Sequence, residues 1–362
     1  MRVLVVKTSS LGDVIHTLPA ITDAARALPG IRFDWVVEEA FAEIPAWHPA
    51  VERVLPVALR RWRRQPFAAA TRREWRAFRA ALDAVEYDLV LDAQGLLKSA
   101  WLARKARGPL HGLDRRSARE PLASFAYAHR HAVPWGRHAV RRVRELFAAA
   151  LGYELPANAV GDDDGADSAD AATYGLDRER IGAHGMRSKT GFEEVPRFVF
   201  LHGTTWPTKH WPEQYWRELA GLALTAGFQV RLPWASATER ERAERIAAGR
   251  DGVCVLPKLT LAGVAAELVA AAGCVAVDTG LGHLAASLGV PALSLFGPTN
   301  PAFTGAWGRQ MRLASDLKCA PCLKKTCPLR VAAGDEPRVE PPCFARLPPA
   351  RVWEALARLL NR

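Results

Sequence analysis

The chain has 362 residues, of which 49% are hydrophobic and 24% are charged, and it carries a formal net charge of +11. This length is too great for one ordinary hydrophobic core and predicts about two domains. No apolar stretch approaches the ~20 residues that span a bilayer, which excludes a membrane-spanning helix. The short apolar run at the N-terminus, without a cleavage pattern, predicts a cytoplasmic protein rather than a secreted precursor. The excess of positive charge predicts an acidic partner, which could be nucleic acid, an anionic membrane surface or an acidic small molecule.

Strand and helix signals alternate through residues 1–160. A short apolar strand, "RVLVV", precedes a helical pattern from Val14 to Leu28, in which apolar residues recur at helical spacing. Further strands are predicted over 31–39, 51–59 and 87–95, with a helix over 71–84 and helical patterns up to Leu151. This alternation predicts an α/β domain with a mainly parallel sheet and crossover helices.

The periodicity is lost between Pro156 and Pro196, where the sequence is acidic and rich in glycine. We therefore expect an interdomain connection over 161–195. The alternation restarts over 196–348, with a helix that begins in a Thr238/Glu241 capping box. A last amphipathic helix is predicted from Pro349 to Leu360. The sequence thus predicts a second α/β domain.

Six cysteines in a cytosolic chain favour free thiols or metal ligands over disulfides. Cys254 and Cys274 stand in apolar, strand-like runs and are expected in the core. The other four have the spacing C-x2-C-x4-C-x15-C in a proline-rich segment: Cys319, Cys322, Cys327 and Cys343. This group could hold a tetrahedral zinc ion, or it could be a thiol-rich surface loop. Both interpretations stay open.

Three polar loops follow predicted strands, where open α/β sheets bind their ligands. They are "KTSSLGD" at 7–13, "HGTTWPTKHW" at 202–211 and "DTGLGH" at 278–283. Each places small residues and hydroxyls at a helix N-terminus, which is a ready anion site. None matches a Walker A loop or a G-x-G-x-x-G fingerprint, which argues against a P-loop ATPase and a standard dinucleotide dehydrogenase.

The residues in these loops could have catalytic or ligand-binding roles, or they could be only structural or solvated. Asp13 is either a general base or an acid that interacts with a helix N-terminus. Lys209, beside Thr204 and Thr205, favours a phosphate site over a solvated lysine. Glu239, by itself, is only an acid in the first turn of a helix.

Seven stretches together resemble a known family: "MRVLVVKTSSLGDVIHTLPA", "FDWVVEEAFAEIPAWHPAVERV", "ALRRWRR", "DAQGLLKSA", "SAREPLAS", "TKHWP" and "DTGLGHLAA". They are similar to the lipopolysaccharide heptosyltransferases of glycosyltransferase family 9, over Met1 to about Thr304. The acidic insertion near Asp162 and the four-cysteine segment depart from that pattern. The resemblance implies inverting glycosyltransferases with the GT-B fold, in which two Rossmann-like domains face a central cleft. It also implies that a C-terminal helix, 349–362, packs back on the N-terminal domain.

The resemblance implies the following roles. Asp13 would be the catalytic base. Residues that bind the ADP-heptose donor would be Thr204, Thr205, Lys209, Glu239, Leu259, Asp278, Thr279, Gly280 and His283. Residues that bind the acceptor, the Kdo sugar of Kdo2-lipid A, would be Ser10, Arg60, Arg61, Arg63, Arg64 and Arg119. No cofactor or metal is expected, since Lys209 and backbone N–H groups can meet the charge of the diphosphate. The "DDD" at Asp162–Asp164 matches the metal-binding D-x-D pattern but does not follow a strand, so it is expected to be a decoy.

The arginine-rich stretch from Arg60 to Arg79 could be only a solvated helix face. It lacks an RNA-binding motif, so we expect no nucleic-acid partner. A phosphorylated acceptor and an anionic inner-membrane surface fit better, with the protein peripheral on the cytoplasmic face. Two alternatives remain: a family member that adds a later heptose, and a non-catalytic protein that binds polyanions.

Overall fold

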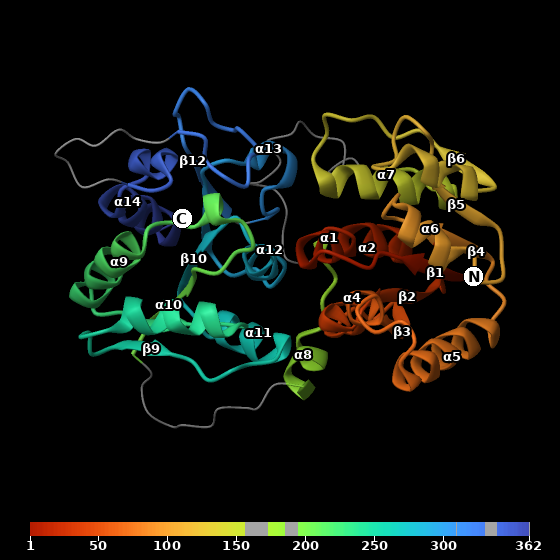
Figure 1. Ribbon diagram of the computed structural model, residues 1–362, viewed down its shortest axis with the longest axis horizontal. Coiled ribbons are helices and arrows are strands. Elements are labelled where there is room, and N and C mark those ends of the chain that lie inside the picture. Colours follow the sequence, from red (N-terminus) through yellow and green to blue (C-terminus); the bar gives the residue numbers. More distant parts are fainter. Residues whose placement is uncertain (156–172, 185–194, 309, 330–338, 362) are drawn as a thin grey trace. The chain divides into compact units, whose positions relative to one another are not determined.

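The computed structural model describes residues 1–155, 173–184, 195–308, 310–329 and 339–361. The chain divides into two compact units. Among the described residues, the first unit contains 1–155 and 173–180, and the second contains 181–184 and 195–361. Both units have the α/β fold class that the sequence predicts, and Figure 1 shows the elements of each.

The first unit is built on a six-stranded sheet in the order β3-β2-β1-β4-β5-β6. Its strands are β1 (Arg2–Val6), β2 (Arg32–Glu38), β3 (Val51–Val57), β4 (Leu89–Asp92), β5 (Leu110–Leu113) and β6 (His129–His131). Its helices are α1 (Leu11–Ile15), α2 (Leu18–Ala27), α3 (Glu43–Ala46), α4 (Leu59–Trp62), α5 (Ala69–Asp83), α6 (Leu97–Ala103) and α7 (Ala139–Leu151), with 3₁₀ turns η1 (Glu39–Phe41) and η2 (Pro121–Ala126). Helix α8 (Arg178–His184) begins in this unit and continues into the second. The helical pattern predicted from Val14 to Leu28 is thus divided between α1 and α2.

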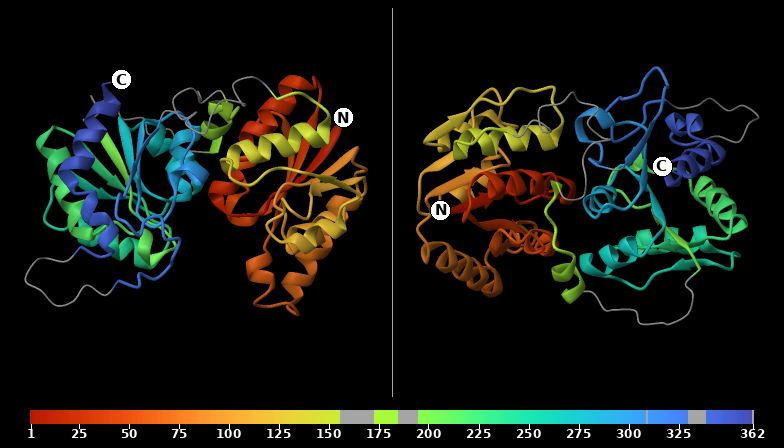
Figure 2. Two further views of the ribbon diagram at one scale, coloured as in Figure 1. Left: turned by 90° about the horizontal axis from the view of Figure 1, so that it is seen from above. Right: turned by 180° about the vertical axis from the view of Figure 1, so that it is seen from behind.

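Helices cover both faces of this sheet because successive residues of a buried strand point to opposite faces. On one face Leu4 and Val6 pack with apolar residues of α4, α5 and α6. On the other face Phe33 lies against Phe147 of α7, with ring centroids 6.3 Å apart. Figure 2 shows helices on both sides of the strands in each unit.

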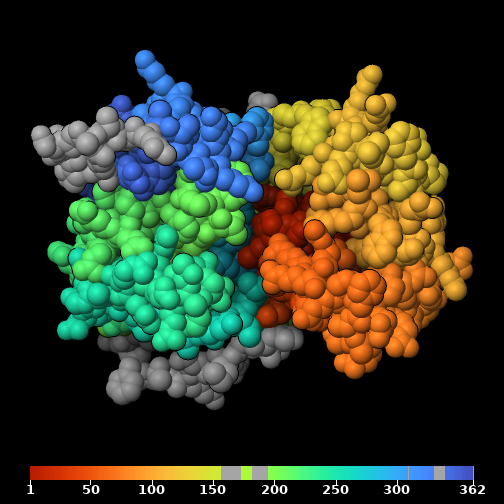
Figure 3. Space-filling view, in the orientation of Figure 1, coloured from red at the N-terminus to blue at the C-terminus, as the bar shows by residue number. Residues whose placement is uncertain are grey.

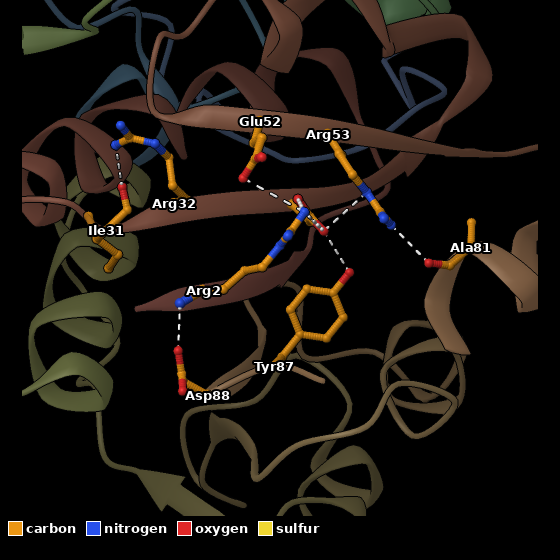
Figure 4. A network of polar contacts seen from close by, with 9 residues as sticks. Arg2, Ile31, Arg32, Glu52, Arg53, Ala81, Tyr87 and Asp88 are labelled. Atoms are coloured by element: carbon orange, nitrogen blue, oxygen red, sulfur yellow. Dashed lines mark hydrogen bonds and ion pairs between the residues drawn. The ribbon is translucent and has the colours of Figure 1, made fainter. Parts of the chain in front are cut away.

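A polar cluster holds the amino-terminal edge of the first sheet together (Figure 4). The carboxylate of Asp34 is completely buried and accepts a hydrogen bond of 2.8 Å from the Tyr87 hydroxyl. The guanidinium groups of Arg2 and Arg53 lie 3.3 Å from its oxygens. These partners compensate a buried charge, so the cluster stabilises the fold on the edge opposite the loops discussed below.

The second unit has a six-stranded sheet in the order β12-β11-β10-β7-β8-β9. Its strands are β7 (Arg197–Leu201), β8 (Gln229–Leu232), β9 (Val253–Val255), β10 (Gly273–Val277), β11 (Ala292–Phe296) and β12 (Gln310–Ala314). Its helices are α9 (Glu213–Thr225), α10 (Ala237–Ala247), α11 (Leu261–Val269), α12 (Gly280–Ser287), α13 (Pro301–Thr304) and α14 (Pro349–Leu360), with 3₁₀ turns η5 (Pro207–Lys209) and η6 (Pro342–Arg346).

The two sheets share one strand order. If the strands of each unit are numbered along the chain, both sheets read 3-2-1-4-5-6, and the pairings are parallel in both. In this order the connections after strands 1 and 4 leave in opposite directions, which opens a crevice at the carboxyl ends of those strands. The crevice therefore lies beside β1 and β4 in the first unit and beside β7 and β10 in the second.

The C-terminal helix packs within the second unit. The apolar face of α14, with Val352, Leu356 and Leu359, is buried in the core of that unit together with β11 and α9. These contacts do not support the expectation that residues 349–362 pack back on the N-terminal domain, which stays a prediction.

Three smaller expectations also change. Residues 173–180, expected in an irregular connection, belong to the first unit, and Tyr174 is completely buried. The capping box of α10 is formed by Ser236 and Glu239 rather than Thr238 and Glu241, because the helix begins at Ala237. Cys254 is exposed rather than buried, since β9 is an edge strand.

In the described part of the chain, helices are all too short or too polar to cross a membrane. The Asp162–Asp164 run lies outside the described residues.

Candidate functional site

The loop after β1 carries Asp13 in the first turn of α1, with Ser10 as the N-cap. One oxygen of Asp13, Oδ2, accepts hydrogen bonds from the backbone N and the hydroxyl of Ser10, at 2.7 and 2.8 Å. The other oxygen, Oδ1, has no hydrogen-bond partner among the described residues. Asp13 is therefore fixed as a helix cap and still has an oxygen able to take a proton.

The loop after β4 lies against this loop and holds it in place. Gln94 accepts hydrogen bonds from the backbone N and the hydroxyl of Thr8, at 2.7 and 2.8 Å. The loop of Gln94 is in turn tied to Asp92, which is completely buried and accepts bonds from Gln94 N, Ser99 Oγ and the Tyr127 hydroxyl. Burial raises the pKa of Asp92, although these hydrogen bonds oppose the rise.

Lys7 lies beneath Asp13 at the end of β1. Its side chain is only 8% exposed, and its ammonium group donates a 2.9 Å hydrogen bond to the carbonyl of Ala93. Burial lowers the pKa of Lys7, and the charges of Asp13 and Asp92 oppose that change. The lysine thus lies within electrostatic reach of the Asp13 carboxylate.

The predicted acceptor arginines follow strands whose carboxyl ends share the edge of Asp13. Arg60, Arg63 and Arg64 follow β3, and their exposed side chains have no ion-pair partner among the described residues. Arg119 follows β5, is exposed, and its charge is among those that lower the pKa of Lys7. These four arginines are available to an anionic ligand.

Arg61 has a different environment. Its guanidinium pairs with Glu39 at 2.9 Å and with Glu74 at 3.0 Å, so it ties α4 to η1 and α5. Hydrogen bonds to Glu39, and then to Glu74, raise the pKa of Arg61. The role of Arg61 in acceptor binding stays a prediction, and an acceptor would have to compete with two carboxylates for this guanidinium.

In the second unit, Lys209 and Asp278 join the loops after β7 and β10. Lys209 Nζ lies 2.7 Å from Asp278 Oδ2, which also accepts a 2.7 Å hydrogen bond from the hydroxyl of Thr299. The hydroxyl of Thr204 donates to the backbone carbonyl of Asp278 at 3.2 Å. The ammonium of Lys209 also lies 4.5 Å from the ring centroid of Trp206. Lys209 is therefore held in one place, and Asp278 positions it.

The start of α12 forms the rest of this edge. Thr279 is the N-cap, and its hydroxyl makes no capping bond to the helix, so it is available to a ligand. Gly280 occupies the first helical position, and His283 is buried within the same turn region. Gly282 packs so closely on β10 that an added Cβ would stand 3.3 Å from Ala276 Cβ. The first N–H groups of an α-helix have no partner within the helix, so this helix start can bind an anion.

Glu239 and Leu259 follow β8 and β9 at the same edge. Glu239 Oε2 caps α10 by accepting from the backbone N of Ala235, at 2.8 Å. Its other oxygen lies beside Gly203, because a Cβ on that glycine would be 2.6 Å from Oε1. Leu259 is half-buried and packs on Gly263 of α11. Thr205, by contrast, is exposed in the described structure.

Sequence reasoning assigned no role to Lys7, which is part of the Asp13 loop, or to Gln94, which accepts two hydrogen bonds from Thr8 of that loop. Lys98 is a further omission, since its ammonium donates to Ser9 Oγ at 3.3 Å. The polar "DAQG" turn directly after a buried strand was the signal for Gln94. Strand order was the missing information, because only the adjacency of β1 and β4 brings the two loops together.

Residues 75–333 match the profile of glycosyltransferase family 9 (heptosyltransferase). Lipopolysaccharide heptosyltransferase 1 of Pseudomonas aeruginosa is 60% identical over 99% of this chain and 98% of that protein. The Escherichia coli protein of the same name is 51% identical over 85% of this chain and 92% of its own. The solved structure of E. coli heptosyltransferase WaaC with ADP-2-deoxy-2-fluoro heptose has a TM-score of 0.78 and 44% identity, and the match covers 99% of each chain.

These similarities extend through both units, and the profile includes the loops of Lys209 and Asp278. They agree with the resemblance seen in the sequence motifs and with the α/β fold of the two units. The chain therefore belongs to glycosyltransferase family 9, the heptosyltransferases.

Proposed function

We propose that this chain transfers L-glycero-D-manno-heptose from ADP-heptose to the Kdo sugar of Kdo2-lipid A, with inversion at the anomeric carbon. The similarity to lipopolysaccharide heptosyltransferase 1 over nearly the whole chain carries this proposal. The geometry of the two sheet edges supports a role for each group.

The proposed base is Asp13. Its unpaired Oδ1 takes the proton of an acceptor hydroxyl while the hydroxyl oxygen forms a bond to the anomeric carbon. The bond from that carbon to the diphosphate oxygen breaks, and ADP leaves with the electron pair. A single displacement with one carboxylate on the acceptor side gives inversion. The hydrogen bonds from Ser10 keep the carboxylate oriented for this step.

The proposed donor site is at the edge of the second unit. Lys209 meets the charge that develops on the departing diphosphate, and the N–H groups at the start of α12 add further donors. Asp278 is a positioning residue, since its carboxylate would repel the diphosphate if Lys209 did not neutralise it. Glu239 accepts from the ribose hydroxyls through the oxygen beside Gly203, and Leu259 contacts the base.

The proposed acceptor site uses Ser10, Arg119 and the arginines of α4, with Arg61 in a lesser role. Phosphates and sugar carboxylates of the acceptor pair with guanidinium groups that have no protein partner. This half of the reaction belongs to the first unit and the donor half to the second, so transfer requires groups from both.

We further propose that the first unit docks on an anionic membrane surface. Figure 3 shows the orange segment of α4 and α5 at the surface. Bulky side chains are exposed there and on the neighbouring α6 and η2: Phe67 is 84% exposed, Trp101 47%, Leu122 63% and Phe125 65%. Trp101 of α6 stacks on Trp75 of α5 at 4.9 Å, and η2 packs against α6. Apolar anchors among arginines suit the headgroup region of an anionic leaflet.

The test is a heptose-transfer assay with the purified chain, ADP-heptose and Kdo2-lipid A. The proposal predicts one heptose added to this acceptor, with release of ADP. Transfer only to an acceptor that already carries heptose would favour a later-acting heptosyltransferase. Binding of the acceptor with no turnover on either substrate would favour a non-catalytic polyanion-binding protein.

A further inference from the structure

Four of the six cysteines line one small cavity in the second unit, and they come from two separate segments. Cys319, Cys322 and Cys327 follow β12, and Cys343 lies in η6, just before α14. The remaining two, Cys254 and Cys274, lie in β9 and β10. The fold therefore gathers the cysteines that the sequence spaces as C-x2-C-x4-C-x15-C.

The cavity has the surroundings of a thiolate site. Its other walls are almost entirely apolar, from Pro298, Leu317, Ala320, Pro341 and Pro342. Cys343 is buried, whereas Cys322 and Cys327 are half-buried and Cys319 is exposed, so an ion could enter from solvent. All six cysteines are free thiols.

From this convergence we infer that the four cysteines form a structural site for a soft divalent metal ion, Zn²⁺ or Fe²⁺. Four sulfur ligands in tetrahedral geometry select these ions, and a C-x2-C turn supplies two of the ligands. Binding replaces the thiol protons, which pass to solvent, so the four sulfurs become thiolates. Their negative charge exceeds that of the ion, and the exposed lysines Lys318, Lys324 and Lys325 flank the segment with compensating charge.

The cysteine side chains must rotate before all four sulfur atoms can bind one ion. In the described residues, no three Cys, His, Asp or Glu side chains already stand at the mutual distances of metal ligands. Neutral thiols do not attract one another, whereas a bound metal ion attracts all four sulfur atoms to itself. The four cysteines nevertheless line the same small cavity.

The site would brace the loop that carries Lys209. The hydroxyl of Thr208 donates a 2.7 Å hydrogen bond to the carbonyl of Lys324, which lies between Cys322 and Cys327. Leu323 N donates to the carbonyl of Pro298, after β11, at 2.8 Å. An ion that fixes the cysteine segment therefore also fixes the residue next to Lys209. This inference rests on the thiols and is independent of the proposed transfer reaction.

The experiment measures metal in the full-length chain, purified under reducing conditions and without a metal-binding tag. Elemental analysis should give about one Zn or Fe per chain, and it tells the two ions apart. Cys322→Ser and Cys327→Ser should each lose most of this metal. Cys254→Ser, which removes an exposed thiol outside the cluster, should retain it. After exchange into Co²⁺, the wild-type chain should show the charge-transfer and ligand-field absorption of a tetrahedral tetrathiolate.

Thiol reactivity of the wild-type chain provides a test that does not depend on whether the variants fold. Chelation of the wild-type protein should make Cys319, Cys322, Cys327 and Cys343 reactive towards a thiol reagent, and added Zn²⁺ should protect them again. The inference is overturned if the wild-type chain holds no metal after incubation with Zn²⁺. It is also overturned if Cys322→Ser keeps a full complement, or if the purified chain shows a disulfide among these cysteines.

Discussion

The two carboxylate oxygens of Asp13 have different surroundings. Oδ2 is held by Ser10, and Oδ1 is left without a partner among the described residues. The sequence alone left Asp13 open between a helix cap and a catalytic base, because both roles place an acid in the first turn. The geometry makes the roles compatible, since one carboxylate can do both.

Replacing Asp13 by Asn separates its role as a helix cap from its role as a general base. The amide oxygen can still accept from Ser10, but the side chain no longer takes a proton. We expect the rate of heptose transfer to fall by about 10²–10⁴, with ADP affinity unchanged by calorimetry. Asp83→Asn, at the exposed end of α5, serves as the control and should keep full activity. Near-normal turnover of Asp13→Asn would leave Asp13 with the cap role alone.

A second residue-scale prediction concerns Lys209. Lys209→Met should weaken ADP binding by about 10–100-fold, because a charge-assisted phosphate contact is removed. The matched control is Lys325→Met, since Lys325 also lies over the Trp206 ring, at 5.5 Å, but has no ion pair with Asp278. Equal losses in both variants would mean that the general positive charge of this surface, and not Lys209, binds the nucleotide.

At the scale of elements, residues 173–180 show where sequence patterns stop being informative. The segment joins the first unit because Arg180 donates to the carbonyls of Ala46 and His48, and Asp177 N donates to Trp47 O at 3.0 Å. Gly175 has φ +62°, and a Cβ there would stand 2.5 Å from His48 Nε2. These contacts are all long-range, so no local periodicity signals them. The long strands and α5, by contrast, were predictable because each carries a complete repeat of apolar residues.

His48, beneath this segment, should make the stability of the first unit depend on pH. Its Nδ1 accepts from Ala50 N at 3.1 Å, which requires an unprotonated nitrogen. Burial, and then the charges of Arg180 and Arg26, lower the pKa of His48 to about 4. The folded pKa lies below the ordinary 6.5, so its contribution is complete above pH 6.5 and is lost as the pH falls towards 4.

We expect protonation of His48 to lower the free energy of unfolding by up to about 3 kcal/mol as the pH falls from 6.5 towards 4. Urea denaturation of wild type and His48→Asn at pH 7.5 and 5 measures it. The difference in stability between the two should shrink at pH 5, because Asn keeps an acceptor for Ala50 N and does not titrate. A difference that stays constant between the two pH values would contradict the assignment.

At the scale of the whole molecule, two units share a strand order without sharing a recognisable sequence repeat. Alternating strands and helices predicted the number of units and their class, because right-handed crossovers leave few arrangements. The same patterns could not say which unit α14 joins, since an amphipathic helix shows that it packs but not on what. Its partner is set by the tertiary fold, where Trp211 Nε1 donates to Leu347 O, just before α14, at 3.0 Å.

The membrane proposal is also tested on the whole molecule. The chain should bind vesicles that contain phosphatidylglycerol more tightly than neutral phosphatidylcholine vesicles, and salt should weaken this binding. Arg63→Ala with Arg64→Ala should cost about 1 kcal/mol per charge in a co-sedimentation assay. Phe67→Ser with Phe125→Ser should weaken binding on either lipid, whereas Phe303→Ser, an exposed aromatic of the second unit, should not. Equal binding to both vesicles would contradict an anionic docking surface.

The burial of α14 in the core of its own unit has a practical consequence. A fragment from Val195 to the C-terminus contains every strand of the second sheet, the helix that closes its apolar core and all the residues proposed to hold the nucleotide. Such a fragment should behave as an autonomous ADP receptor, free of the exposed aromatic side chains of the first unit. It would allow inhibitors of the donor site to be screened without a lipid substrate, and a helix-truncated version that ends before Pro349 should fail to fold.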